Sequence, residues 1–176
     1  MKKVSIALSI FILFSTSVVA QTCKTNMLPS HPENQYIDNK DGTITDIINE
    51  LMWSTCSLGQ TYREGNCDDE ATSFNSWNEA LLAAKISESY LAYNDWRLPN
   101  IKELGSLVER SCVAPAIDLG LFPKTAALPY WSNTFDGSDI NSTIKGLLIH
   151  FNNGTETINP IENKKLIRLV RSLPKP

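Results

Sequence analysis

The chain has 176 residues, of which 16 are Lys or Arg and 19 are Asp or Glu, and its formal net charge is −3. An acidic chain without a long basic tract lacks the positive surface that nucleic acids bind, so nucleic-acid partners are excluded. The length suits one domain with a sizeable core.

The first 20 residues have the pattern of a secretory signal peptide. Lys2 and Lys3 precede a short apolar run at residues 6–14, and Ala20 ends a small-residue cleavage site. The run is too short to span a bilayer comfortably, which disfavours a retained membrane anchor. We therefore expect cleavage after Ala20, a secreted, periplasmic or cell-surface location and no membrane contact after cleavage.

Four cysteines follow this segment, at positions 23, 56, 67 and 112. An even count in an exported chain favours disulfides, and the clustered spacing of a zinc site is missing. Three pairings are possible. We favour Cys56–Cys67, which closes a short loop, together with Cys23–Cys112, which ties an N-terminal arm at residues 21–34 to a domain at 35–176.

The sequence around Asp41-Gly42 predicts a β-hairpin. Residues 35–38 and 43–46 flank the turn, and Gly tolerates the positive φ that the turn needs. A calcium loop of the EF-hand type is disfavoured, because Ile37 and Ile48 fall where its first and last ligands would stand. We expect a third strand at residues 51–53.

Two helices are predicted from their start signals. Ser76 with Glu79, and Asn100 with Glu103, have the spacing of a capping box, and Pro99 ends the strand before the second helix. Residues with helical spacing predict the buried faces, namely Trp77, Ala80, Leu81 and Ala84 in the first helix and Ile101, Leu104 and Val108 in the second.

The remaining segments are predicted from alternation and turn residues. We expect a loop at residues 59–72, strands at 130–134, 147–151 and 166–171, and a polar loop at 135–143. Arg168 and Arg171 should lie on opposite faces of the last strand.

Several short stretches then resemble, in order, the Lcl C-terminal domain family, which is found in exported bacterial proteins and named for a collagen-like adhesin. They are Asp41-Gly42-Thr43-Ile44-Thr45-Asp46, Leu51-Met52-Trp53, Trp77 to Leu81, Asp95-Trp96-Arg97-Leu98-Pro99-Asn100, Lys102-Glu103-Leu104, Pro115-Ala116-Ile117-Asp118, Tyr130-Trp131-Ser132 and Leu166 to Arg171. The resemblance runs from about Tyr36 to Arg171.

The Arg97-Leu98-Pro99 turn with its acidic helix also resembles the formylglycine-generating-enzyme branch of C-type-lectin-like folds. This resemblance implies an α+β domain, C-type-lectin-like and disulfide-stapled, with two short helices packed on antiparallel β-sheet. The Lcl family has Gly directly before Leu-Met-Trp, where this chain has Glu50. We expect Asn49 to take the left-handed conformation there.

No catalytic constellation is visible. His31 and His150 stand apart from any nucleophile motif, and the late cysteines of formylglycine chemistry are missing. We expect no enzyme activity, no metal and no cofactor. Asp136 and Asp139 are weighed as metal or sugar ligands, with a solvated loop as the alternative.

A ligand site is predicted where aromatic rings adjoin amide and carboxylate groups, at Tyr130, Trp131, Asn133 and Asp136. An apolar platform with a few polar groups suits saccharide recognition, although a buried strand beside a loop has the same pattern.

The predicted function is that of a secreted or surface-exposed bacterial binding module for adhesion, with an extracellular glycan or a surface protein as partner and possible homo-oligomers. The founding family member's domain binds sulfated glycosaminoglycans as a trimer, which is what the resemblance implies. The acidic charge argues against polyanion binding here and favours a neutral glycan or a protein. The alternative is a structural or interaction subunit of a pilus or secretion apparatus.

Overall fold

The structure is a computed structural model that describes residues 20–87, 90–137, 145–159 and 165–174. The predicted signal peptide lies outside these ranges, except for Ala20. Within them, no helix is long and apolar enough to cross a membrane.

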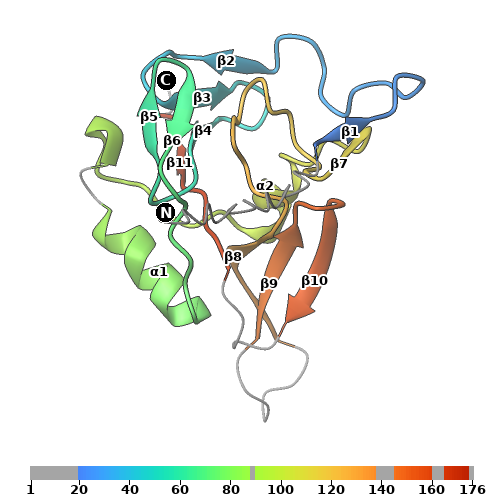
Figure 1. Cartoon of the computed structure of the whole chain (residues 1–176). Coiled ribbons are helices and arrows are strands. Elements are labelled where there is room, and N and C mark those ends of the chain that lie inside the picture. The colour runs from blue at the N-terminus through green and yellow to red at the C-terminus, as the bar shows by residue number, and fades with distance from the viewer. Residues whose placement is uncertain (1–19, 88–89, 138–144, 160–164, 175–176) are drawn as a thin grey trace, which may run out of the picture.

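The fold is α+β, as predicted, and is built from short antiparallel sheets with two α-helices (Figure 1). The strands are β1 (Thr22–Cys23), β2 (Tyr36–Asp38), β3 (Thr43–Asp46), β4 (Leu51–Ser54), β5 (Thr61–Arg63), β6 (Asn66–Asp68), β7 (Cys112–Val113), β8 (Pro129–Asp136), β9 (Lys145–His150), β10 (Thr155–Asn159) and β11 (Val170–Ser172). The helices are α1 (Trp77–Ile86), the 3-10 turn η1 (Tyr90–Ala92) and α2 (Ile101–Gly105).

Two sheets form the frame of the domain. The first has the strand order β11-β4-β3-β2 and contains the predicted hairpin at Gly42, whose φ is 92°. The second has the order β10-β9-β8, and α2 lies against β8 and β9 while α1 contacts β8. Figure 1 shows α1 on one flank of the molecule and the second sheet extending away from the first.

The middle of the second sheet is buried on both faces, because successive residues of β8 and β9 enter different cores. Tyr130 and Ile149 belong to one core, which also contains Trp53 and Leu104 of the first sheet and α2. Their neighbours Trp131 and Leu148 belong to the other core, together with residues of α1. Successive side chains of a strand point to opposite faces, so of two adjacent hydrophobic residues one packs into each core.

The cap of α2 is the predicted capping box. The Asn100 side chain accepts from the backbone N–H of Glu103 at 2.9 Å, and the Glu103 carboxylate accepts from the N–H of Asn100 at 2.7 Å. The helix ends at Gly105, so the predicted stripe residue Val108 is buried beyond the helix rather than on it.

The cap of α1 differs from the prediction in one half. Ser76 accepts from the backbone N–H of Glu79 at 3.2 Å, as expected. The Glu79 carboxylate accepts from the N–H of Asn75 at 2.9 Å and not from that of Ser76. The chain enters the helix in an extended conformation at Ser76, and the carboxylate reaches one residue further back.

Two further local predictions, at residues 59–72 and at Asn49, were wrong. Residues 59–72 are not all loop, because β5 and β6 pair as a hairpin whose turn contains Glu64 and Gly65, both with positive φ. The left-handed residue before β4 is Glu50 itself, with a φ of 53°, and Asn49 is not left-handed. The turn is thus built with a glutamate at positive φ, a conformation that is strained for a residue with a side chain.

The predicted disulfides are both present. Cys56 is bonded to Cys67 and Cys23 to Cys112, and no cysteine is free. The second bond lies beside the short β1–β7 pairing, which holds the N-terminal arm against the domain.

The last strand is shorter than predicted, because β11 begins at Val170, so Arg171 lies on it and Arg168 precedes it. Arg168 is fully buried and donates to backbone carbonyls of Ser54 and Thr55. Arg171 donates to Asp95 at 2.5 Å and lies over the ring of Tyr93.

Candidate functional site

The predicted aromatic platform is not on the surface. Tyr130 and Trp131 each have 0% exposed area, and the Tyr130 hydroxyl is hydrogen-bonded to Ser57 Oγ at 2.7 Å. Lys165 Nζ lies over the Trp131 ring, 4.5 Å from its centre. Neither ring offers a face on which a ligand could stack, because both faces of the second sheet are buried at this point.

The two polar residues of the predicted site lie apart from any aromatic platform. Asn133 is exposed and donates to the carbonyl of Leu98 at 3.2 Å. Asp136 is half-buried at the end of β8, and Asp139 lies outside the described residues. Ligand contact at Asn133 and Asp136 stays a prediction.

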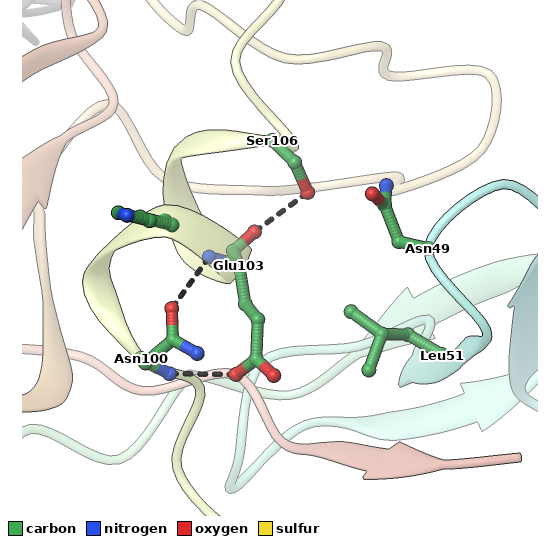
Figure 2. Close-up of a pocket in the computed structure, with 6 residues that line it drawn as sticks. Asn49, Leu51, Asn100, Glu103 and Ser106 are labelled. Atoms are coloured by element: carbon green, nitrogen blue, oxygen red, sulfur yellow. Dashed lines mark hydrogen bonds between the residues drawn. The ribbon is translucent and has the colours of Figure 1, made fainter.

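A small hollow of about 190 Å³ lies at the start of α2 (Figure 2). Asn100, Glu103 and Ser106 line it, but their polar groups already bond to one another and to the helix backbone. Asn49 and Leu51 close the other side. Lys102 also lines the hollow. The capping bonds engage the polar groups of Asn100, Glu103 and Ser106, so these three offer little further hydrogen bonding to a ligand.

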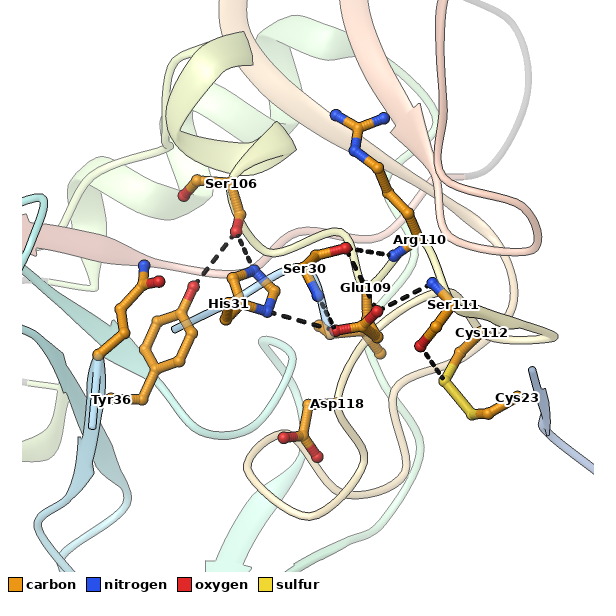
Figure 3. Close-up of polar contacts among 12 residues, drawn as sticks. Cys23, Ser30, His31, Tyr36, Ser106, Glu109, Arg110, Ser111, Cys112 and Asp118 are labelled. Atoms are coloured by element: carbon orange, nitrogen blue, oxygen red, sulfur yellow. Dashed lines mark hydrogen bonds and ion pairs between the residues drawn. A yellow bond between two sulfur atoms is a disulfide. The ribbon is translucent and has the colours of Figure 1, made fainter. Parts of the chain in front are cut away.

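A polar cluster around Glu109 fixes the N-terminal arm (Figure 3). The buried carboxylate accepts from Ser30 N at 2.9 Å, from Ser30 Oγ at 3.2 Å and from Ser111 N at 2.9 Å. His31 Nε2 lies 2.6 Å from the carbonyl of Ser106. Burial raises the pKa of Glu109, but the hydrogen bonds from Ser111 and Ser30 outweigh it, so the pKa is lowered. These contacts are internal and hold the arm in place.

The best candidate for a binding site is a cavity of about 310 Å³ between two loops, at residues 69–73 and 124–128. We call it the Gln60 cavity. It is lined by Gln60, Glu70, Ala71, Ser73, Lys124, Ala126, Leu128 and Leu166. Its volume falls at the lower end of the roughly 300–1,000 Å³ of small-molecule sites, and it combines an apolar floor with a few polar groups, as such sites do.

Gln60 supplies the most distinctive group in the cavity. Its side chain is only 8% exposed, and its Oε1 accepts from the backbone N–H of Ser57 at 3.0 Å. That bond identifies which amide atom of Gln60 is the oxygen, so the NH2 points away from Ser57 N. Among the described residues no group accepts a hydrogen bond from this NH2. The NH2 is not among the described buried atoms that lack a partner, so it is open to the solvent, where water or a ligand can reach it.

Two features hold the walls of the cavity. Buried Arg168 donates to Thr125 Oγ1 at 2.7 Å on one wall and lies 3.5 Å from Ser57 Oγ beneath the other. Gly59 has a φ of 100°, and a Cβ added there would lie 2.2 Å from Thr72 Oγ1. The loop that carries Gln60 therefore packs directly against the loop at residues 69–73.

Sequence reasoning missed this cavity because its lining comes from four separate segments of the chain. The sequence did contain two signals, a charged residue at position 168 within an otherwise apolar strand and a glycine at 59 in a polar stretch. Neither signal indicates which segments meet.

Metal ligands do not gather in the described part of the chain. Residues 20–87, 90–137, 145–159 and 165–174 contain no group of three or more His, Cys, Asp or Glu placed to hold a metal ion.

The family model of the Lcl C-terminal domain matches residues 42–171. This covers the second sheet, the first sheet except β2 and the last residue of β11, both α-helices and every residue of the Gln60 cavity. The chain therefore belongs to the Lcl C-terminal domain family. No curated protein and no solved structure matched the chain. The family, together with two disulfides, indicates an extracellular domain of a surface protein.

Proposed function

We propose that this domain is a recognition module of a bacterial surface, which binds a neutral glycan or a protein partner during adhesion. The Gln60 cavity is the observation that carries the proposal, because it offers an apolar floor and a donor that the fold leaves unused. The module works by binding and not by catalysis, and it takes neither cofactor nor metal.

The charge of the chain supports a neutral partner. The formal net charge is −3 with the predicted signal peptide and −5 without Lys2 and Lys3. A sulfated polysaccharide would be repelled by such a surface at low ionic strength. The proposal therefore does not extend the polyanion binding of the family's founding member to this chain.

The finer parts of the proposal concern fold relation, location and assembly. We propose a C-type-lectin-like arrangement, export by the N-terminal signal peptide, and action at the cell surface, with homo-oligomers possible. Export and a surface location would place the domain where it can contact other cells or surfaces.

A glycan array with neutral and sulfated members, run beside a heparin column, tests the proposal. We expect binding to neutral glycans and no retention on heparin at low salt. Retention on heparin with no neutral binding would contradict it. Co-purification with a larger surface complex, with no glycan bound, would favour the alternative role as a subunit of a pilus or secretion apparatus.

A further inference from the structure

We propose that the Gln60 cavity binds one ring of a neutral sugar, and that the Gln60 amide donates a hydrogen bond to a hydroxyl or acetamido oxygen of that ring. This rests on the proposed function above and names the site and the ligand class.

The donor sets the first requirement. Gln60 lines the cavity, and its Oε1 accepts from the backbone N–H of Ser57 at 3.0 Å, which leaves the NH2 of the same amide for a ligand. A purely apolar ligand would remove water from this NH2 and give it no acceptor, which is unfavourable. The ligand must therefore carry an acceptor at this point.

The charges at the rim set the second requirement. Glu70 stands on one loop and Lys124 on the other, and Lys124 Nζ already lies 3.4 Å from Asp68. An anionic ligand would meet the Glu70 carboxylate, and a cationic one the Lys124 ammonium. A neutral ligand with several hydroxyl groups can donate to the first and accept from the second.

The floor sets the third requirement. Ala71, Ala126, Leu128 and Leu166 contribute apolar surface, and Leu128 is half exposed at the entrance. A sugar ring offers C–H groups to such a floor and hydroxyl groups to the rim. The Arg168–Thr125 hydrogen bond and the close packing at Gly59 fix the two sides of the cavity. Binding therefore needs little loss of conformational entropy in the protein.

The test is an NMR titration of the ¹⁵N-labelled protein with methyl glycosides of glucose, galactose, mannose and N-acetylglucosamine. The side-chain NH2 signals of Gln60 are identified by their loss in Gln60→Glu. This variant keeps an oxygen for Ser57 N–H and replaces the donor. We expect the Gln60 signals to shift saturably with at least one sugar, and Gln60→Glu to weaken its binding at least about tenfold.

Asn78→Asp is the matched control, since it makes the same amide-to-acid change at an exposed position of α1. It should bind sugar as the unchanged protein does. Ala126→Trp, whose larger side chain fills the cavity, is the second variant. It should abolish sugar binding, and it replaces Gln60→Glu as the test if that variant fails to fold.

Sugar binding that survives both Gln60→Glu and Ala126→Trp would overturn the cavity assignment and leave the proposed function standing. The absence of any sugar binding would also overturn the inference. If the glycan array were negative as well, the glycan form of the proposed function would fail with it. Binding of a protein partner that Gln60→Glu abolishes, with no sugar bound, would assign the cavity to a peptide and overturn the ligand class.

Discussion

Arg97 and Glu103 form a two-pronged ion pair at the start of α2, with both nitrogen–oxygen distances at 2.8 Å. The same carboxylate accepts from the backbone N–H of Asn100, so one side chain closes the turn and caps the helix. Arg97 is thereby engaged within the fold. The polar groups of Arg97, Asn100 and Glu103 therefore stabilise the turn that leads into α2.

The first prediction concerns this carboxylate. Glu103→Gln keeps the shape of the side chain but removes its charge, which weakens the pair with Arg97 and the cap at Asn100. We expect the free energy of unfolding in urea to fall by about 1–3 kcal/mol. Glu33→Gln, at an exposed position of the arm, is the control and should change it little. Equal stability of the two variants would contradict the role given to Glu103.

The second prediction concerns acid. Burial raises the pKa of Glu103, but hydrogen bonds from Arg97 and Asn100 lower it further, so the pKa lies below its ordinary 4.5. The pKa of Glu109 is lowered in the same way by Ser111 and Ser30. A carboxylate with a lowered folded-state pKa contributes stability that is present above its unfolded-state pKa and is lost as the pH falls through the folded-state value.

Unfolding midpoints measured across pH should therefore be steady above about pH 5 and fall below it. The double variant Glu103→Gln, Glu109→Gln should show a shallower fall than the unchanged protein. An equally steep fall in both would show that other groups govern the acid response.

The third prediction concerns Gly59. Gly59→Ala places a Cβ 2.2 Å from Thr72 Oγ1 and 2.4 Å from its backbone nitrogen, so the two loops must separate. We expect a lower free energy of unfolding and weaker sugar binding. Gly65→Ala is a matched control, because Gly65 also has a positive φ, at 82°, but no atom lies within 4 Å of an added Cβ. It should cost only the backbone strain of about 1–2 kcal/mol and leave binding unchanged. Equal effects of both variants on binding would contradict the contact.

The fourth prediction concerns Glu50, whose φ of 53° is unfavourable for a residue with a side chain. Glu50→Gly removes that strain while loosening the unfolded chain. We expect a net gain of about 0.5–1 kcal/mol in the free energy of unfolding. Glu33→Gly, where φ is not positive, should instead destabilise or have no effect. A loss of stability in Glu50→Gly would show that the Glu50 side chain makes a contact worth more than the strain.

The features that the sequence predicted correctly are local or strongly constrained. The cap of α2 follows from Asn100 and Glu103 three residues apart, and the hairpin follows from Gly42. Both disulfides are as predicted. Cys56 and Cys67 are close in sequence, and pairing them leaves only Cys23 and Cys112 for the second bond. Such features need little knowledge of the rest of the fold.

The site could not be predicted in the same way. Tyr130 and Trp131 lie next to each other on a strand buried on both faces, which gives the same pattern as an exposed aromatic platform. The Gln60 cavity needs Gln60, Lys124 and Leu166 to meet, and no periodicity or spacing links them. Only the packing of loops from different parts of the chain brings them together.

The salt dependence of ligand binding tests the central claim most directly. Exposed charges are largely screened beyond a few ångströms at about 1 M salt, so polyanion binding weakens steeply as salt rises while neutral-sugar binding does not. We predict that the protein binds a neutral glycan with the same affinity at about 0.1 M and about 1 M NaCl. Binding confined to sulfated glycans, and lost at the higher salt, would contradict the account.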